Sequence, residues 1–376
     1  MKDTEKEPFF IKEIKEQPKV LANTLTQYLG PNLHLKMTRP PLDDLTLKKI
    51  RQVYITACGT SYHAGMTARY IFEELAHLPT VVEPASEAGS HHLLIDDRTL
   101  AVAVSQSGRS PDTLAALELA KSRGAVTLAL VNEAGSPLTE AASGFLMTLA
   151  GQVFTLSSTK AFTSQTLLLS LLACRLAQSR GLLKDSWTAE LESLGRLPEM
   201  IRHVLADEAR AGQLAEKLVS YEHLFILARG AMLPMAYEGA LKFKEVARFH
   251  AEGYSIGEFG HGPLALAGPG TPVILLSFSG DPDGRTLELA RSVCSRGAPL
   301  YLISEDGPKK DGPLARLAEA YFPLPPVQPR WRPLVAIVPL QLLAYHLGRK
   351  KGLDTDRPGG LLGGDESSFG QPPERG

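Results

Sequence analysis

One pattern occurs twice in this chain. The stretch that begins at Ser105 reads SQSGRSPDTLAALELAKSRGAVTLAL, and the stretch that begins at Ser277 reads SFSGDPDGRTLELARSVCSRGAPLYLI. Each copy has a serine-containing turn, then a helical pattern, then an apolar run. Two copies so far apart indicate a duplicated domain rather than a solenoid of short repeats. At 376 residues, the chain is long enough to hold two such domains.

The order of apolar and helical patterns predicts the class of each domain. Expected strands at 51–58, 81–83, 100–104, 126–132 and 145–150 alternate with helical patterns, and the alternation restarts with expected strands at 223–228 and 273–278. Strands that alternate with helices form a parallel sheet covered by helices. We therefore expect an α/β fold with two tandem doubly wound parallel-sheet domains.

The composition divides the rest of the chain. We expect a helical extension at 1–50, a first domain at 51–184, a helical connector at 185–220, a second domain at 221–352 and a glycine-rich tail at 353–376.

The overall composition excludes several classes of function. The chain has 40 basic and 41 acidic residues, so no basic excess points to nucleic acid. It shows no apolar run of membrane-spanning length and no signal-peptide core. Cys58, Cys174 and Cys294 are far apart, which favours a reducing compartment and no zinc site. We expect a cytoplasmic protein with no metal and no cofactor.

The serine-rich turn of the first copy is typical of a phosphate site. Ser105 and Ser107 supply hydroxyls, and Gly108 lets the backbone approach a ligand closely. Ser110 is a suitable N-cap for a helix that begins with Pro111. Backbone N–H groups at a helix N-terminus bind dianionic phosphate. An ordinary polar loop between a strand and a helix is the alternative.

A second turn, Gly59-Thr60-Ser61, follows a neighbouring expected strand. Open parallel sheets bind ligands beyond the carboxyl ends of their strands, so the two turns are expected to converge on one crevice. In the second copy the matching turn carries Asp281 and Asp283, which would repel a phosphate. We therefore expect one working phosphosugar pocket, in the first domain.

Acid–base candidates lie farther along the chain. Glu238, Lys242 and Glu245 share one helical face by their spacing. The stretch 251–262 is predicted to be a glycine-rich loop that carries His261. Glu245 could shuttle a proton between adjacent sugar carbons, and His261 could assist ring opening. The alternative is a solvated helix face with ion pairs.

Several motifs together resemble a known family. They are Cys58-Gly59-Thr60-Ser61, Ser105-Gln106-Ser107-Gly108, Ser157-Ser158-Thr159-Lys160-Ala161-Phe162-Thr163, Lys244-Glu245, His261-Gly262-Pro263-Leu264-Ala265 and the stretch from Pro339 to His346. In this order they resemble the SIS (sugar isomerase) family. Within it, the likeness is to the isomerase half of the glutamine:fructose-6-phosphate amidotransferases and to the SIS-type glucosamine-6-phosphate deaminases.

The resemblance implies a homodimer that binds a sugar phosphate. It implies that Glu245 is the catalytic glutamate and that His261 opens the sugar ring after reaching over from the partner subunit. The phosphosugar-binding positions that it implies are Gly59, Thr60, Ser61, Ser105, Gln106, Ser107, Ser110 and Ser158.

Three features depart from the amidotransferase pattern. The chain shows no glutaminase domain and no cysteine near Met1, so we expect it not to release ammonia from glutamine by itself. The family's tail lysine, which forms a Schiff base with the sugar, has its place at about Gly363. The turn Arg109-Ser110-Pro111-Asp112 looks more like that of the deaminases.

Three functions follow as hypotheses. The first is an enzyme that converts glucosamine 6-phosphate to fructose 6-phosphate and ammonia. The second is a synthase-like isomerase that uses free or partner-supplied ammonia. The third is a phosphosugar sensor without catalysis.

Overall fold

Two parallel sheets form the framework of the molecule. The computed structural model describes residues 7–30, 35–37, 41–92, 94–182, 187–278, 284–305 and 312–357. Within them, each sheet has five strands, in the orders β2-β1-β3-β4-β5 and β10-β9-β8-β6-β7, and every strand pair is parallel. The expected α/β fold with two tandem doubly wound sheets is confirmed.

The first sheet and its helices follow the chain in alternation. Its strands are β1 (Gln52–Ala57), β2 (Thr80–Pro84), β3 (Thr99–Ser105), β4 (Val126–Val131) and β5 (Gly144–Met147). Its helices are α3 (Gly59–Ile71), α4 (Pro111–Ser122), α5 (Pro137–Ala141) and α6 (Lys160–Ser179). Every residue of β3 is buried, which is why that strand reads as a continuous apolar run.

The second sheet repeats this order. Its strands are β6 (His223–Ala228), β7 (His250–Ser255), β8 (Val273–Leu276), β9 (Leu300–Glu305) and β10 (Ala320–Leu324). Its helices are α10 (Leu233–Ala247), α11 (Ile256–Phe259), α12 (Arg285–Ser295), α13 (Pro313–Leu317) and α14 (Arg332–Lys350). By strand order, β6 is therefore the counterpart of β1, and β8 is the counterpart of β3.

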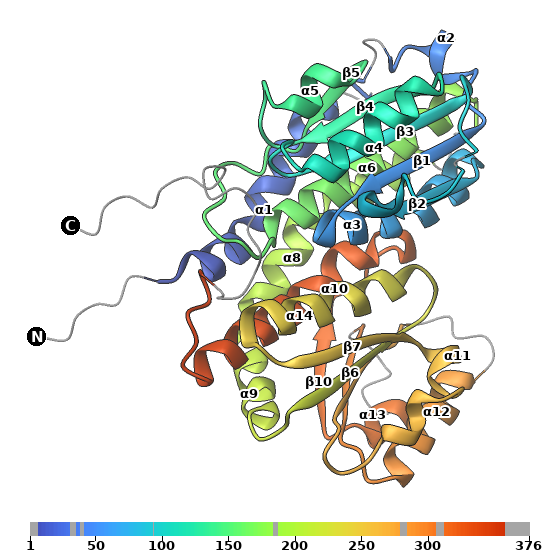
Figure 1. Ribbon diagram of the computed structural model, residues 1–376. Helices are drawn as coiled ribbons and strands as arrows, with labels where there is room; N and C mark the ends of the chain where they lie inside the picture. Colours follow the sequence, from blue (N-terminus) through green and yellow to red (C-terminus); the bar gives the residue numbers. More distant parts are fainter. Residues whose placement is uncertain are drawn as a thin grey trace, which may run out of the picture.

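Helices from both repeats pack between the sheets. In Figure 1, α10 and α14 lie between the upper and lower sheets, and α10 contacts both α14 and α3. One hydrophobic core runs through both repeats, because it includes residues of α3, α6, α10 and α14. The other helices are α1 (Phe9–Tyr28), α2 (Asp44–Leu47), α7 (Trp187–Gly195), α8 (Leu197–Ala206) and α9 (Glu208–Leu218).

Two local predictions were wrong. Residues His250–Ser255 form the edge strand β7, paired with β6, and are not part of a loop. The strand was not predicted because it contains a glycine and a glutamate, which interrupt the apolar pattern expected of a strand. A Cβ on Gly253 would lie 2.7 Å from the backbone carbon of Ala236, so the glycine permits the close packing of α10 on β7. The turn predicted at 59–61 is the first turn of α3, which begins at Gly59.

The chain ends are tied together where they are described. No side chain of its own segment caps α1; instead, Asp356 accepts hydrogen bonds from the N–H groups of Phe9 (2.9 Å) and Phe10 (2.8 Å). Residues 358–376, and with them Gly363, lie outside the described residues. None of the described helices has the length and apolar character of a membrane span.

Candidate functional site

The turn after β3 presents its serine hydroxyls in a fixed arrangement. Ser105 Oγ accepts a hydrogen bond from the Gly108 N–H (3.0 Å), and Ser107 Oγ accepts one from the Arg109 N–H (3.2 Å). Ser110 caps α4 by accepting from the N–H of Thr113. Because Ser105 and Ser107 accept from backbone, their own O–H groups are left to donate to a ligand oxygen.

Gly108 is required in this turn. Its φ is +65°, and a Cβ there would lie 2.1 Å from Ser136 Oγ. Any side chain would therefore be strained and would clash. The turn is closed further by the Leu138 N–H, which donates to the Gly108 carbonyl at 3.1 Å.

The turns after β1 and β3 lie side by side, as the strand order predicts. Cys58 Sγ is 3.7 Å from both Ser110 Oγ and Thr113 Oγ1. Two residues later, the side chain of Thr60 enters a buried cluster of charged groups. The sequence 58–60 thus joins the serine-rich turn to that cluster.

Lys242 is the centre of the cluster. Its Nζ lies 2.6 Å from Glu245 Oε2 and 3.3 Å from Glu238 Oε1. It also donates to Thr60 Oγ1 (3.0 Å) and to Ser157 Oγ (3.1 Å). The side chains of Lys242 and Glu238 are fully buried, so the solvated helix face considered above is wrong for these two residues.

Each hydroxyl in the cluster bridges the lysine to one carboxylate. Thr60 donates to Glu238 Oε1 at 3.1 Å, and Ser157 donates to Glu245 Oε2 at 2.5 Å. The other oxygen of Glu238 lies 2.7 Å from Nδ1 of His63. The buried charges are thus paired and hydrogen-bonded, which is the condition for holding them away from water.

The charges in the cluster stabilise one another. Burial by itself raises the pKa of Glu238, but Lys242 and His63 outweigh it and hold that pKa below its ordinary value. Burial likewise lowers the pKa of Lys242, but Glu238 and Glu245 outweigh it and raise that pKa. The charged forms of Lys242 and Glu238 therefore stabilise each other.

Glu245 is the carboxylate of this cluster that is partly exposed, while Glu238 is fully buried. The Glu245 side chain is 14% exposed, whereas that of Lys242 is fully buried. Both hydrogen bonds of Glu245 use Oε2, and across the described chain no partner is found for Oε1. One oxygen fixes the carboxylate and the other is available, which suits a group that takes a proton from a ligand and returns it.

Of the other predicted site residues, Ser61, Gln106 and Ser158 are half-buried, and His261 is exposed. Ser61 lies half-buried in the first turn of α3, and Gln106 lies half-buried beside the serines. Ser158 is half-buried, but its neighbour Ser157 makes the contacts with Lys242 and Glu245. His261 is exposed on the turn after α11, and none of its side-chain contacts within the described residues reaches the cluster.

Sequence reasoning did not choose Ser157 or His63 as site residues, and it did not predict the burial of Lys242. Lys242 was placed on the right face of its helix, but periodicity does not show that this face is buried against another domain. Ser157 adjoins the serine that was chosen, and the pattern of hydroxyls does not fix which one points inward. His63 lies one turn after Thr60 on α3, and that spacing was the available signal.

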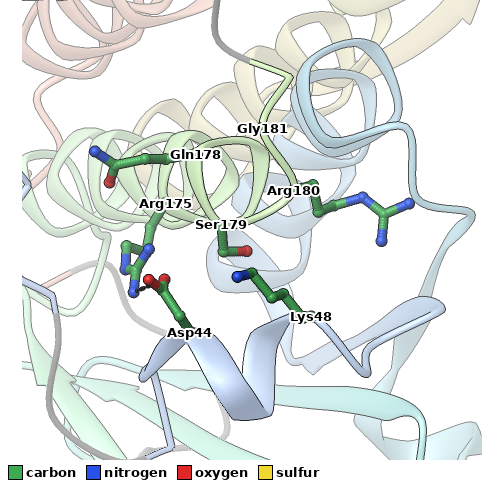
Figure 2. Close-up of a pocket in the computed structure, with 7 residues that line it drawn as sticks. All are labelled: Asp44, Lys48, Arg175, Gln178, Ser179, Arg180 and Gly181. Atoms are coloured by element: carbon green, nitrogen blue, oxygen red, sulfur yellow. Dashed lines mark hydrogen bonds and ion pairs between the residues drawn. The ribbon is translucent and has the colours of Figure 1, made fainter.

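A cavity lies at the amino-terminal edge of the first sheet, at the other end of the strands from the serine-rich turn. It measures about 510 Å³ and is lined by Asp44, Lys48, Arg175, Gln178, Ser179, Arg180 and Gly181 (Figure 2). Arg175 donates to the carbonyls of Met37 and Leu42 and pairs with Asp44, so it holds the segment before β1 in place. The predicted site residues do not line this cavity. The described part of the chain holds no cluster of metal-ligating side chains.

Known proteins are similar to this chain in sequence and in fold. The chain is 36% identical over 354 residues to the glutamine–fructose-6-phosphate aminotransferase (isomerizing) of Clostridium tetani and 41% identical over 360 residues to that of Pseudomonas putida. Each alignment covers 94% of this chain and 58% of the relative, so the chain spans a little over half of their length.

Two solved structures give the same result. The C-terminal domain of the Francisella tularensis glucosamine-fructose-6-phosphate aminotransferase superposes with a TM-score of 0.89 at 33% identity, covering 94% of this chain and 99% of that one. The Thermotoga maritima glucosamine-6-phosphate deaminase superposes with a TM-score of 0.71 at 25% identity, covering 92% and 96%. The SIS domain model matches residues 46–175 and 217–347. The chain therefore belongs to the SIS domain family, with two repeats, and is related to the isomerase portion of the aminotransferases.

Proposed function

We propose that the chain is a phosphosugar enzyme that couples aldose–ketose isomerisation to deamination of glucosamine 6-phosphate. The observation that carries the proposal is the available oxygen of Glu245, held in place by Lys242 and Ser157 beside the serine-rich turn. A proton-transfer group next to a phosphate-binding turn suits a reaction between adjacent carbons of a sugar phosphate.

The serine-rich turn holds the phosphate in this proposal. Ser105, Ser107 and the N-terminus of α4 receive the anion, with Gln106, Ser110 and Ser158 around it, while Gly59, Thr60 and Ser61 border the sugar. Binding the phosphate at one end fixes the position of the open-chain carbons relative to Glu245. Remote binding energy is then used to orient the reacting atoms.

Glu245 moves one proton along the open-chain substrate. It takes the hydrogen from C2 of the 2-amino aldose and returns it to C1, which leaves an imine at C2. Water then adds at C2 and ammonia leaves, giving fructose 6-phosphate. One water is consumed and one ammonia is released, so the reaction balances without an oxidant or a reductant.

Ring opening falls to His261 of the neighbouring subunit in a homodimer. The exposure of His261 and its separation from the cluster within one chain support this assignment. A mixture of the Glu245→Gln and His261→Ala variants tests it, because hybrid dimers would contain one intact site. Activity that returns on mixing supports the shared site, and a mixture that stays as inactive as its two components contradicts it.

The first experiment measures ammonia release from glucosamine 6-phosphate, with N-acetylglucosamine 6-phosphate as the matched control. Release from the first sugar alone is the expected result. The names of the relatives favour the opposite direction, so the same enzyme is also given fructose 6-phosphate and ammonia. Tight binding with no turnover in either direction would support the sensor hypothesis instead.

A further inference from the structure

A cavity in the second repeat occupies the position that the candidate site has in the first. It measures about 260 Å³, and its lining includes Arg229 after β6 and Ser277 after β8. The carboxyl ends of β6 and β8 correspond to those of β1 and β3. We call this cavity the second-domain pocket.

The pocket residues match those of the first site along the repeat. Arg229 directly follows β6, as Cys58 directly follows β1. Ser277 aligns with Ser105 in the two copies of the repeated sequence. Thr286 stands in the first turn of α12, as Thr113 does in α4. The cavity therefore lies at the ligand-binding edge of the second sheet, where the candidate site lies in the first.

The charge of the pocket favours an anion. Arg229 and Arg332 line it, and no acidic side chain is found among its described lining residues. Glu305 holds Arg332 through two hydrogen bonds of 2.7 and 3.2 Å, and the guanidinium lies over the ring of Phe278. The arginine is thus fixed in position before any ligand arrives.

The N-terminal ends of three helices add to the positive potential in the pocket. Thr286 is in the first turn of α12, and Arg332 is the first residue of α14. Met232, which also lines the pocket, is the N-cap residue of α10. Three helices of eleven or more residues therefore direct their positive N-terminal ends toward one hollow.

Ser277 is a mostly buried residue whose side chain forms no hydrogen bond to another described residue. It is 8% exposed and lines the pocket. Buried polar side chains are nearly always hydrogen-bonded. A ligand oxygen in the pocket would supply a partner, as expected for Ser105 in the first repeat.

The pocket lacks the groups for proton transfer. In the first site a lysine and two glutamates of α10 meet Thr60 and Ser157, whereas the described lining of the second-domain pocket holds no glutamate, aspartate, histidine or lysine. A ligand in this pocket would therefore bind without undergoing a chemical reaction. The volume is below the about 300–1,000 Å³ typical of sites for drug-sized ligands, so the occupant is small.

We propose that the second-domain pocket is a separate, non-catalytic binding site for the phosphate group of a small metabolite. The expectation that this repeat had lost phosphate binding rested on Asp281 and Asp283, which lie outside the described residues. The described lining residues include Arg229, Arg332 and Ser277.

The test is calorimetric titration of the full chain with fructose 6-phosphate, repeated with inorganic phosphate. We expect two sites per chain. Arg229→Gln and Ser277→Val are expected to weaken one of them by about tenfold or more, since each removes a polar contact to the anion. Arg316→Gln removes an exposed arginine of the same domain and is the control that should leave both sites unchanged.

The first site is removed independently by the double change Ser105→Ala and Ser107→Ala. In that variant the second site should still bind, and Arg229→Gln added to it should abolish binding. Tighter binding of fructose 6-phosphate would assign the site to sugar phosphates, and equal or tighter binding of inorganic phosphate would assign it to free phosphate. Arg229 is exposed, so its variant is expected to fold even if Ser277→Val does not.

One site per chain in the wild type would overturn the proposal. So would two sites that both resist Arg229→Gln. Neither result depends on turnover, so failure of the second-domain pocket is distinct from failure of the proposed reaction, which appears as absent ammonia release.

Discussion

The two repeats have the same topology, yet of their equivalent helices α3 and α10 only α10 buries charged side chains. Helix α10 of the second repeat carries Glu238 and Lys242, both fully buried. Their counterparts on α3 of the first repeat are Thr67 and Ile71, which are buried without any charge. Because α10 contacts α3, both charged side chains reach Thr60 of the first repeat.

The two copies of the duplicated domain therefore contribute different chemical groups. The first repeat supplies a serine-rich turn and hydroxyls, and the second supplies acid–base groups and a pocket with two arginines. Substitutions in each repeat should therefore affect only the contribution assigned to that repeat.

Replacing Lys242 should have the largest effect. Lys242→Met keeps the size of the side chain but leaves Glu238 and Glu245 without their cation in a buried place. Removal of one partner of a buried ion pair costs about 3–5 kcal/mol. Urea unfolding of the variant should show a loss of this size. Lys244→Met, at an exposed lysine of the same helix, is the control and should unfold like the wild type.

The double variant Lys242→Met, Glu238→Gln refines this test. It removes one stranded carboxylate and should regain part of the lost free energy of unfolding. A Lys242→Met variant as stable as the wild type would mean that the cluster does not stabilise the contact between the repeats.

Loss of the serine hydroxyls should affect the first repeat alone. Ser105→Ala or Ser107→Ala removes a hydrogen bond to a charged phosphate, worth about 1.5–3 kcal/mol. Steady-state kinetics should show a raised KM for the sugar phosphate. Ser122→Ala, at an exposed serine of α4, is the matched control. An unchanged KM in both variants would move the phosphate away from this turn.

The pH dependence of stability should reflect Glu238. Its pKa is lowered in the folded state, so its contribution is present above the unfolded value of about 4.5 and is lost as the pH falls through the folded pKa. The pKa of Lys242 is raised, so its contribution is present below about 10.5 and is lost as the pH rises through the folded pKa.

Between these limits the contributions of Glu238 and Lys242 to the free energy of unfolding should be nearly independent of pH. Glu238→Gln should reduce the loss of stability in acid relative to neutral pH. If the stability of the Glu238→Gln variant falls in acid as steeply as that of the wild type, other carboxylates determine the loss of stability at low pH.

The cap on the first helix should have the smallest effect. Asp356→Ala leaves the N–H groups of Phe9 and Phe10 without their acceptor. Loss of a helix N-cap costs about 0.5–2 kcal/mol. Calorimetry should show this decrease, and Asp356→Asn should retain part of the stability. No change would mean that the end of the chain does not hold α1.

The sequence predicted the parts of this molecule that depend on local pattern. Strands such as β3 are continuous apolar runs, and Ser110 with Pro111 marks the start of α4, so both were found. The edge strand β7 was missed because Gly253 and Glu252 break its pattern, and the reason for that glycine lies in the packing of α10. Local pattern does not reveal contacts of this kind.

The same limit applies to the site. The two turns were predicted to converge because strand order is a matter of topology, and Cys58 lies beside Ser110 as expected. The burial of Lys242 depends on how α10 packs against α3, which periodicity does not specify. Ser158 was assigned from the family resemblance, and the sequence alone does not specify that Ser157 turns its side chain toward Lys242 and Glu245.

The central claim is that Glu245 moves the proton between C1 and C2 of a phosphosugar held by the first repeat. The most direct test incubates the Glu245→Gln variant with fructose 6-phosphate in deuterium oxide and follows deuterium at C1 by NMR. The wild type should exchange this hydrogen, and the variant should exchange it about 10²–10⁴-fold more slowly while still binding the sugar phosphate. Exchange at the wild-type rate in the variant would contradict the account.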